Sequence, residues 1–175
     1  MVNYFKHFGL DWQFDLDLVE LKKKFLIKSR ELHPDFHTDK SESEQEAILA
    51  KSSYNNSAFK VLKNPYSRFK YLLTLHKVDF EESKQSLPQM FLMEMMDFNE
   101  KLMDAQMESD QSQISSLIKE LEKIEKSLFS GVSSILKGYK PDEITESELI
   151  SLQEYYFKKK YLLRIRENLD RFASS

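Results

Sequence analysis

The stretch LVELKKKFLIKSRELHPDF, residues 18–36, decides the fold of this 175-residue chain. Its apolar side chains recur at the spacing of one helical face, and lysines and an arginine cover most of the remaining surface. The members of that face are Leu18, Leu21, Phe25 and Leu32. Asp17 is placed as an N-cap, and Pro34 cannot continue a helix and disfavours helical dihedrals at the residue before it. We therefore predict an amphipathic helix from Leu18 to about Leu32 that ends at the tripeptide His33-Pro34-Asp35.

The residues on either side of this stretch predict three further helices. A short aromatic helix covers about 3–10, and a short helix over 66–76 follows the break at Asn64-Pro65. Between them, the polar stretch Phe36 to Ser43 predicts an exposed loop. Ser43 and Glu46 form a capping-box pattern, so we expect a long helix from there to about Lys63. Its inward side chains should be Ile48, Leu49, Ser52, Ala58, Phe59 and Leu62. Two long helices with opposed apolar faces predict an antiparallel hairpin, closed at its ends by the two short helices.

The second half of the chain predicts three long helices. Charges, serines and a proline interrupt the periodicity over 77–88, where we place a linker between a first domain, 1–76, and a second domain, 89–175. Apolar positions then recur at helical spacing over about 89–108, 111–137 and 145–172. The chain has only three Gly and four Pro, and helices need fewer turn residues than sheets do. We therefore expect an all-α protein with a C-terminal three-helix bundle.

The composition excludes several classes of protein. The chain has no Cys, which removes disulfides, thiolate metal ligands and cysteine nucleophiles. A net charge of −3 argues against a general affinity for nucleic acid. We see no secretory leader and no run of the ~20 apolar residues that a membrane span needs. We therefore expect a cytoplasmic protein that binds neither nucleic acid nor a membrane.

The helix over 89–108 has more apolar residues than one buried face requires. Phe91, Met95, Phe98 and Leu102 form one stripe, which is enough to face a bundle core. Four more apolar residues lie off that stripe: Leu92, Met93, Met96 and Met103. An exposed apolar strip on a helix usually marks a partner site, and methionine suits adaptable surfaces. This pattern predicts a protein-binding face; the alternative is that these methionines complete a thick core.

The first 76 residues resemble a J domain. The markers, in order, are Tyr4-Phe5 with Phe8-Gly9-Leu10, Leu21 to Leu32 followed by His33-Pro34-Asp35, Asn55 to Leu62, and Asn64-Pro65 with Arg68 and Tyr71. The resemblance implies that His33, Pro34 and Asp35 stimulate ATP hydrolysis by a DnaK-type chaperone. It also implies that basic residues of the preceding helix dock on that chaperone, and by position these are Lys22, Lys23 and Lys24. The family often continues with basic residues where this chain has Leu26, Ile27 and Glu31, so the docking surface should be shifted or thinner here.

The whole chain resembles the J-domain co-chaperones of bacterial iron–sulfur cluster assembly, the HscB type. The resemblance continues through 71–76, a short acidic linker and Phe91-Leu92-Met93-Glu94-Met95-Met96-Asp97. It implies an L-shaped molecule that stimulates the ATPase of a DnaK/HscA-type chaperone and delivers an IscU-type cluster scaffold protein to it, promoting cluster transfer. The scaffold-binding face of the family corresponds here to Leu92, Met93, Met96, Asp97, Glu100, Asp104 and Phe157. We expect no catalytic site, no cofactor and no metal in this chain.

Two other readings of the same residues stay open. The Met-rich helix could serve a J protein with a different client, or support weak self-association. His33, Asp35, His37 and Asp39 alternate like a metal cluster, which would suit a small metal-dependent enzyme. They lie on one loop without a second, distant ligand group, and Glu42, Glu44 and Glu46 fit the start of a solvated helix better than acid–base catalysis.

Overall fold

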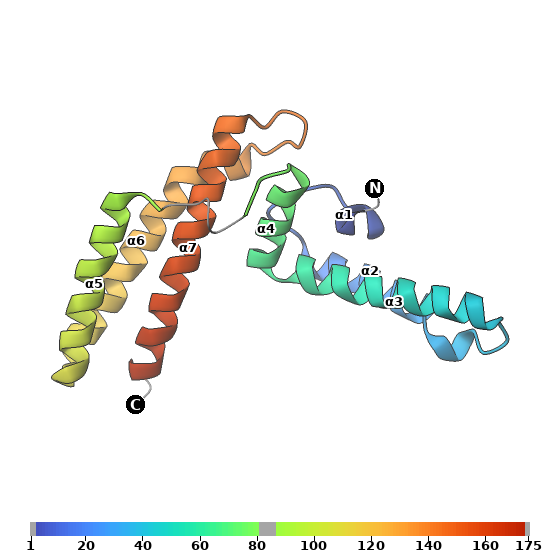
Figure 1. Ribbon diagram of the computed structural model, residues 1–175, viewed down its shortest axis with the longest axis horizontal. Coiled ribbons are helices and arrows are strands. Elements are labelled where there is room, and N and C mark those ends of the chain that lie inside the picture. Colours follow the sequence, from blue (N-terminus) through green and yellow to red (C-terminus); the bar gives the residue numbers. More distant parts are fainter. Residues whose placement is uncertain (1–2, 81–86, 174–175) are drawn as a thin grey trace. The chain divides into compact units, whose positions relative to one another are not determined.

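The computed structural model describes residues 3–80 and 87–173, and in this part of the chain it contains seven α-helices, one 3-10 turn and no strand (Figure 1). The expected all-α fold is confirmed. The chain divides into two compact units, Met1–Lys77 and Val78–Ser175. Residues 81–86 of the expected linker lie outside the described residues. No helix in the described ranges has the length and apolar character of a membrane-spanning segment.

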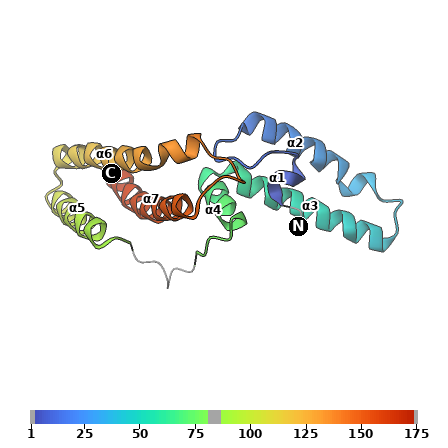
Figure 2. The same ribbon diagram turned by 90° about the horizontal axis from the view of Figure 1, so that it is seen from above.

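The N-terminal unit is built on a hairpin of two helices. Its elements are α1 (Tyr4–His7), α2 (Leu18–Glu31), η1 (Pro34–Phe36), α3 (Glu42–Lys63) and α4 (Pro65–Leu75). Figure 2 shows α2 and α3 running side by side, joined at one end by the loop that contains η1. The predicted N-cap is confirmed, because the Asp17 carboxylate accepts hydrogen bonds from the amides of Val19 and Glu20. Helices α1 and α4 pack against α3, around a core that includes Phe5, Leu21, Ala58, Leu62, Leu72 and Leu73.

The start of α3 differs from the sequence expectation. The capping box is formed by Ser41 and Glu44 rather than by Ser43 and Glu46, so the helix begins at Glu42. The Glu44 carboxylate accepts from the Ser41 amide at 3.0 Å, and Gln45 Nε2 donates to the Lys40 carbonyl at 2.9 Å. The loop is thus held by the first turn of the helix and is shorter than we expected.

The inward face of α3 also begins later than the periodicity suggests. Leu49 is 61% exposed, and Asn55 is the first buried residue of the helix. The reason is that the polar loop around η1, and not a helix, lies beside the first turns of α3. Pro34 and His37 of this loop line a pocket of about 390 Å³ together with Ile48 and Leu49.

The C-terminal unit is a three-helix bundle of α5 (Gln89–Met107), α6 (Gln111–Lys137) and α7 (Glu146–Ala173). The predicted bounds of α6 are confirmed, with Asp110 as its N-cap and Gly138 as its C-cap. Helices α6 and α7 pack along their length, and the shorter α5 packs on both (Figures 1 and 2). The predicted core stripe Phe91, Met95, Phe98 and Leu102 is buried, against Leu117, Leu121, Leu162 and Ile165.

Two residues of the expected linker belong to this unit. The Asp79 carbonyl accepts a hydrogen bond from Gln153 Nε2 on α7. The Phe80 ring contacts the rings of Tyr156 and Phe157 at centroid distances of 5.2 and 5.8 Å. The chain is therefore anchored to α7 before residue 81.

Candidate functional site

The tripeptide His33-Pro34-Asp35 forms an exposed turn directly after α2. His33 is the N-cap of η1, and its Nδ1 accepts a hydrogen bond from the Asp35 amide at 3.3 Å. In the neutral imidazole this hydrogen bond places the proton on Nε2. The side chains of His33 and Asp35 are 54% and 83% exposed, and Nδ1 lies 3.6 Å from Asp35 Oδ2. The turn therefore offers a partner one N–H donor and one carboxylate that are fixed relative to each other.

Backbone hydrogen bonds hold this turn. The amides of Phe36 and His37 donate to the carbonyls of His33 and Pro34 at 3.1 and 2.9 Å. Pro34 occupies the first position of the turn, where its fixed φ and missing amide carry no penalty. His37 Nε2 lies 2.7 Å from the Glu31 carbonyl, which ties the loop back to the end of α2. Since these contacts exist before any partner binds, little conformational entropy remains to be lost on docking.

The three expected docking lysines do not share one face of α2. Consecutive helical positions differ by about 100° around the axis, so three in a row spread over more than half the helix. Lys24 Nζ donates to the Gly9 carbonyl at 3.0 Å and pairs with Glu20 at 3.1 Å, inside the unit. Lys22 and Lys23 are exposed. Arg30, seven residues after Lys23, is exposed on the same side, and the seven-residue spacing in the sequence is the signal for it.

The off-stripe residues of α5 are exposed. Met93 and Met96 are 59% and 68% exposed, and Leu92 is 37% exposed. The bundle core is complete without them, so the alternative that these methionines thicken the core is wrong. Asp97, Glu100 and Asp104 are exposed on the outward side of the same helix. The structure therefore places six of the seven expected scaffold-binding residues on the solvent side of α5.

The seventh residue, Phe157, lies half-buried on α7 against Phe80 and Tyr156. Tyr161, one turn further along α7, contacts Phe91 at 5.9 Å and accepts a hydrogen bond from Asn99 Nδ2 at 3.4 Å. Asn99 is three residues after Met96 and seven after Leu92, so that edge of α5 faces α7. This geometry puts Phe157 beside the exposed apolar residues of α5.

No group of three or more His, Asp or Glu side chains in residues 3–80 and 87–173 is arranged to hold a metal ion. His37 is turned toward the Glu31 carbonyl, away from His33 and Asp35. Glu44 is used as a helix cap, and the hydrogen bonds from Ser41 lower the pKa of its carboxyl. The His-Asp alternation therefore has the geometry of a structured turn.

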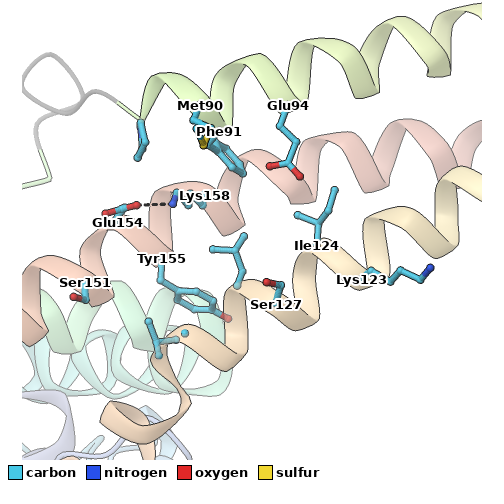
Figure 3. Close-up of a pocket in the computed structure, with 14 residues that line it drawn as sticks. Met90, Phe91, Glu94, Lys123, Ile124, Ser127, Ser151, Glu154, Tyr155 and Lys158 are labelled. Carbon is cyan, nitrogen blue, oxygen red and sulfur yellow. Dashed lines mark ion pairs between the residues drawn. The ribbon is translucent and has the colours of Figure 1, made fainter.

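An open groove of about 720 Å³ lies between the first turns of α5 and the α6–α7 pair, and no sequence pattern predicts it (Figure 3). Its apolar wall includes Phe91, Ile124, Leu128 and Val132, and Met90 and Glu94 lie on its α5 side. Lys158 pairs with Glu154 and lies 5.5 Å from the Phe91 ring centroid. The groove exists because α5 is shorter than its two neighbours, and no nucleophile–base pair lines it.

Comparison with known proteins places these features in a family. Residues 87–170 match the family model described as the HSCB C-terminal oligomerisation domain. The human protein named "Iron-sulfur cluster co-chaperone protein HscB" is 31% identical over 156 residues, which cover 89% of this chain and 64% of that protein. The Vibrio atlanticus "Co-chaperone protein HscB homolog" is 40% identical over 110 residues, 62% of this chain and 64% of that protein. The matched part thus spans 64% of the length of both curated relatives.

Two solved structures have the same fold. The chaperone HscB from Vibrio cholerae superposes with a TM-score of 0.74 at 24% identity, over 97% of this chain and 96% of that one. The crystal structure of human co-chaperone protein HscB superposes with a TM-score of 0.77 at 26% identity, over 97% and 81%. These similarities identify residues 87–170 as a C-terminal domain of the HSCB type and show that the chain has the fold of the HscB co-chaperone proteins.

Proposed function

We propose that this chain stimulates the ATPase of a DnaK/HscA-type chaperone and delivers an IscU-type iron–sulfur cluster scaffold protein to it, promoting cluster transfer. The observation that carries the proposal is the His33-Pro34-Asp35 turn, which is exposed and held by hydrogen bonds at the end of a basic helix. The name of the human relative refers to iron–sulfur clusters, which supports this cargo.

The chaperone would bind the N-terminal unit. In this proposal His33 Nε2 and the Asp35 carboxylate contact the chaperone, and Lys22 and Lys23 dock on an acidic surface of it. Lys24 Nζ already donates to the Gly9 carbonyl and pairs with Glu20. Arg30, on the side of Lys23, would therefore make the third basic contact with the chaperone. A cation in this position adds mainly to the rate of association, because exposed charges steer encounters more than they hold complexes.

The scaffold would bind the C-terminal unit. The apolar centre of the face is Leu92, Met93 and Met96, with Phe157 beside it. Asp97, Glu100 and Asp104 form an acidic border on the solvent side. Because one chain binds both proteins, the scaffold is held at a high effective concentration beside the chaperone. Hydrolysis then leaves the chaperone in its ADP state with the scaffold bound, and no covalent step is assigned to this chain.

Single-turnover ATP hydrolysis by the same organism's DnaK/HscA-type chaperones tests this proposal. The full chain is compared with His33→Gln and, as a matched control, His37→Gln, in which the Gln amide can still donate to the Glu31 carbonyl. We expect the wild type and His37→Gln to stimulate hydrolysis, His33→Gln to lose most of the stimulation, and the scaffold to raise it further. If no chaperone responds to the wild type, the proposal is wrong.

Adding or omitting the scaffold in this assay distinguishes an IscU-type scaffold from a different client protein. Stimulation that depends on His33 but ignores the scaffold would keep the co-chaperone activity and assign the Met-rich face to a different client protein. Adding unrelated unfolded proteins in the same assay identifies that case.

A further inference from the structure

Two more exposed methionines of helix α5 lie on the same side as the face described above. Met103 and Met107 are 58% and 78% exposed. They follow Leu92 by 11 and 15 residues and Met96 by 7 and 11, spacings that return to the same side of an α-helix. We define the methionine strip as the exposed apolar residues on this side of α5: Leu92, Met93, Met96, Met103 and Met107.

The bundle does not use Met103 and Met107 for its own packing. The opposite side of α5 is already filled by Phe91, Met95, Phe98, Leu102 and Ala105, each at most 7% exposed. A contiguous exposed apolar patch usually marks an interaction surface, because its exposure to water costs solubility without adding to the core. The strip therefore continues to the C-terminal end of the helix for a reason other than folding.

Two polar residues lie between the ends of the strip, the exposed Glu100 and, at the edge that faces α7, Asn99. The Asn99 amide donates to Tyr161 on α7, so part of its hydrogen-bonding capacity is already used within the bundle. A partner that covers both ends of the strip would therefore contact Asn99 as a half-buried side chain that is already hydrogen-bonded to Tyr161. At 1.5 Å per residue, the distance from Leu92 to Met107 along the axis is about 22 Å.

The solvent-exposed flank of the strip is acidic. It carries the carboxylates of Asp97, Glu100, Asp104 and, at the C-cap, Glu108. The one lysine of α5, Lys101, pairs at 3.2 Å with Glu120 on α6, on the other side of the helix. A partner of the strip would therefore need an apolar patch bordered by Lys or Arg side chains, since charges of opposite sign face each other across specific interfaces.

We propose that the scaffold contact extends over the full methionine strip, so that Met103 and Met107 are additional scaffold-binding residues in this chain. The occupant is an IscU-type scaffold with an apolar patch about 22 Å long, bordered by basic side chains. This inference rests on the proposed function. It adds two residues that lie two to three turns away from Met96.

Calorimetric titration of the full chain with the same organism's IscU-type scaffold tests the extension. The variants are Met96→Gln and the double variant Met103→Gln with Met107→Gln, because glutamine keeps the helix propensity and removes the apolar end. Met90→Gln is the matched control: Met90 is 82% exposed on the same helix but lies on the groove side. We expect roughly tenfold weaker binding for Met96→Gln and for the double variant, as for central interface residues, and no change for Met90→Gln.

The outcomes separate the extension from the function on which it rests. Weaker binding for Met96→Gln with unchanged binding for the double variant would overturn the extension alone. If the wild type does not bind the scaffold, both the extension and the proposed cargo are wrong. Sedimentation velocity of the chain alone tests whether a second copy of the chain binds the strip instead. If the double variant loses a self-association that the wild type shows while it keeps its scaffold affinity, Met103 and Met107 bind a second copy and the proposal fails.

Discussion

Asn55 illustrates, at the scale of one residue, how the N-terminal unit is fixed. It is 1% exposed, and its amide bridges the three helices α1, α2 and α3. Oδ1 lies 2.9 Å from His7 Nε2, and Nδ2 donates to Ser29 Oγ at 3.0 Å. A buried polar group of this kind stabilises the fold only while its hydrogen bonds are made, so the side chain selects one arrangement of the three helices.

Asn55→Ala should lower the free energy of unfolding of the N-terminal unit by roughly 1–3 kcal/mol, because His7 and Ser29 lose a buried partner. The neighbouring Asn56 is exposed, and Asn56→Ala should change the free energy of unfolding by less than about 0.5 kcal/mol. Urea denaturation followed by the fluorescence of Trp12, the single tryptophan of the chain, reports on this unit. Equal stabilities for the two variants would show that the Asn55 contacts are not needed.

At the scale of one element, the start of α3 depends on which serine caps it. The structure uses Ser41, whose Oγ accepts from the Glu44 amide while the Glu44 carboxylate accepts from the Ser41 amide. Ser41→Ala should therefore destabilise the N-terminal unit by about 1 kcal/mol. Ser43→Ala changes a residue inside the first turn and should cost only a few tenths of a kcal/mol. The same Trp12-monitored urea curves measure both variants. A larger loss of stability for Ser43→Ala than for Ser41→Ala would show that Ser43, and not Ser41, caps the helix.

Helices α6 and α7 are joined by a three-residue ion network. Glu125 on α6 pairs with Lys159 at 2.8 Å and with Arg166 at 2.6 Å, both on α7. Burial raises the pKa of the Glu125 carboxyl, but the hydrogen bonds from the two cations lower it more, so its pKa lies below the ordinary carboxyl value. A carboxyl whose pKa is lowered by folding contributes stability above its unfolded pKa, and this contribution is lost as the pH falls through the folded pKa.

Hydrogen exchange of α6 and α7 in wild type and Glu125→Gln should show this dependence. At neutral pH the variant should exchange faster, because two cations lose their partner, and the difference should shrink as the pH falls through the lowered pKa of the Glu125 carboxyl, where the wild type becomes protonated. Glu167→Gln is the control, since Glu167 is exposed and makes no ion pair in the described part of the chain. A difference that persists unchanged at low pH would assign the effect of the variant to packing.

At the scale of the whole molecule, each of the two units has a core of its own. Leu62 and Leu121 are 0% exposed, one in the N-terminal and one in the C-terminal unit. Leu62→Ala should lower the stability of the N-terminal unit by roughly 2–5 kcal/mol and speed hydrogen exchange in α1 to α4 while leaving α5 to α7 unchanged. Leu121→Ala should give the reverse pattern. Faster exchange in all seven helices for either variant would show that the units unfold together.

The sequence by itself was sufficient for features that depend on neighbouring residues. Pro34 ends α2 because it cannot continue a helix, Asp17 caps its start, and the 3.6-residue period separated the buried stripe of α5 from its exposed methionines. These effects act within one turn of the chain, so they can be predicted without knowing what the helix packs against. The exposure of His33 and Asp35 followed in the same way from the end of a helix in a polar loop.

The remaining features depended on residues far apart in the chain, and only the tertiary structure decided them. Lys24 Nζ donates a hydrogen bond to the Gly9 carbonyl, 15 residues away. Leu49 is exposed because a loop and not a helix lies beside it, and the groove exists because α5 is shorter than α6 and α7. Periodicity predicts that a helix has an apolar face, whereas the length and position of its neighbours determine which part of that face is covered. For this protein, local chemistry therefore determined the helices and the exposed turn, and packing between distant segments determined which charged and apolar side chains remain available to partners.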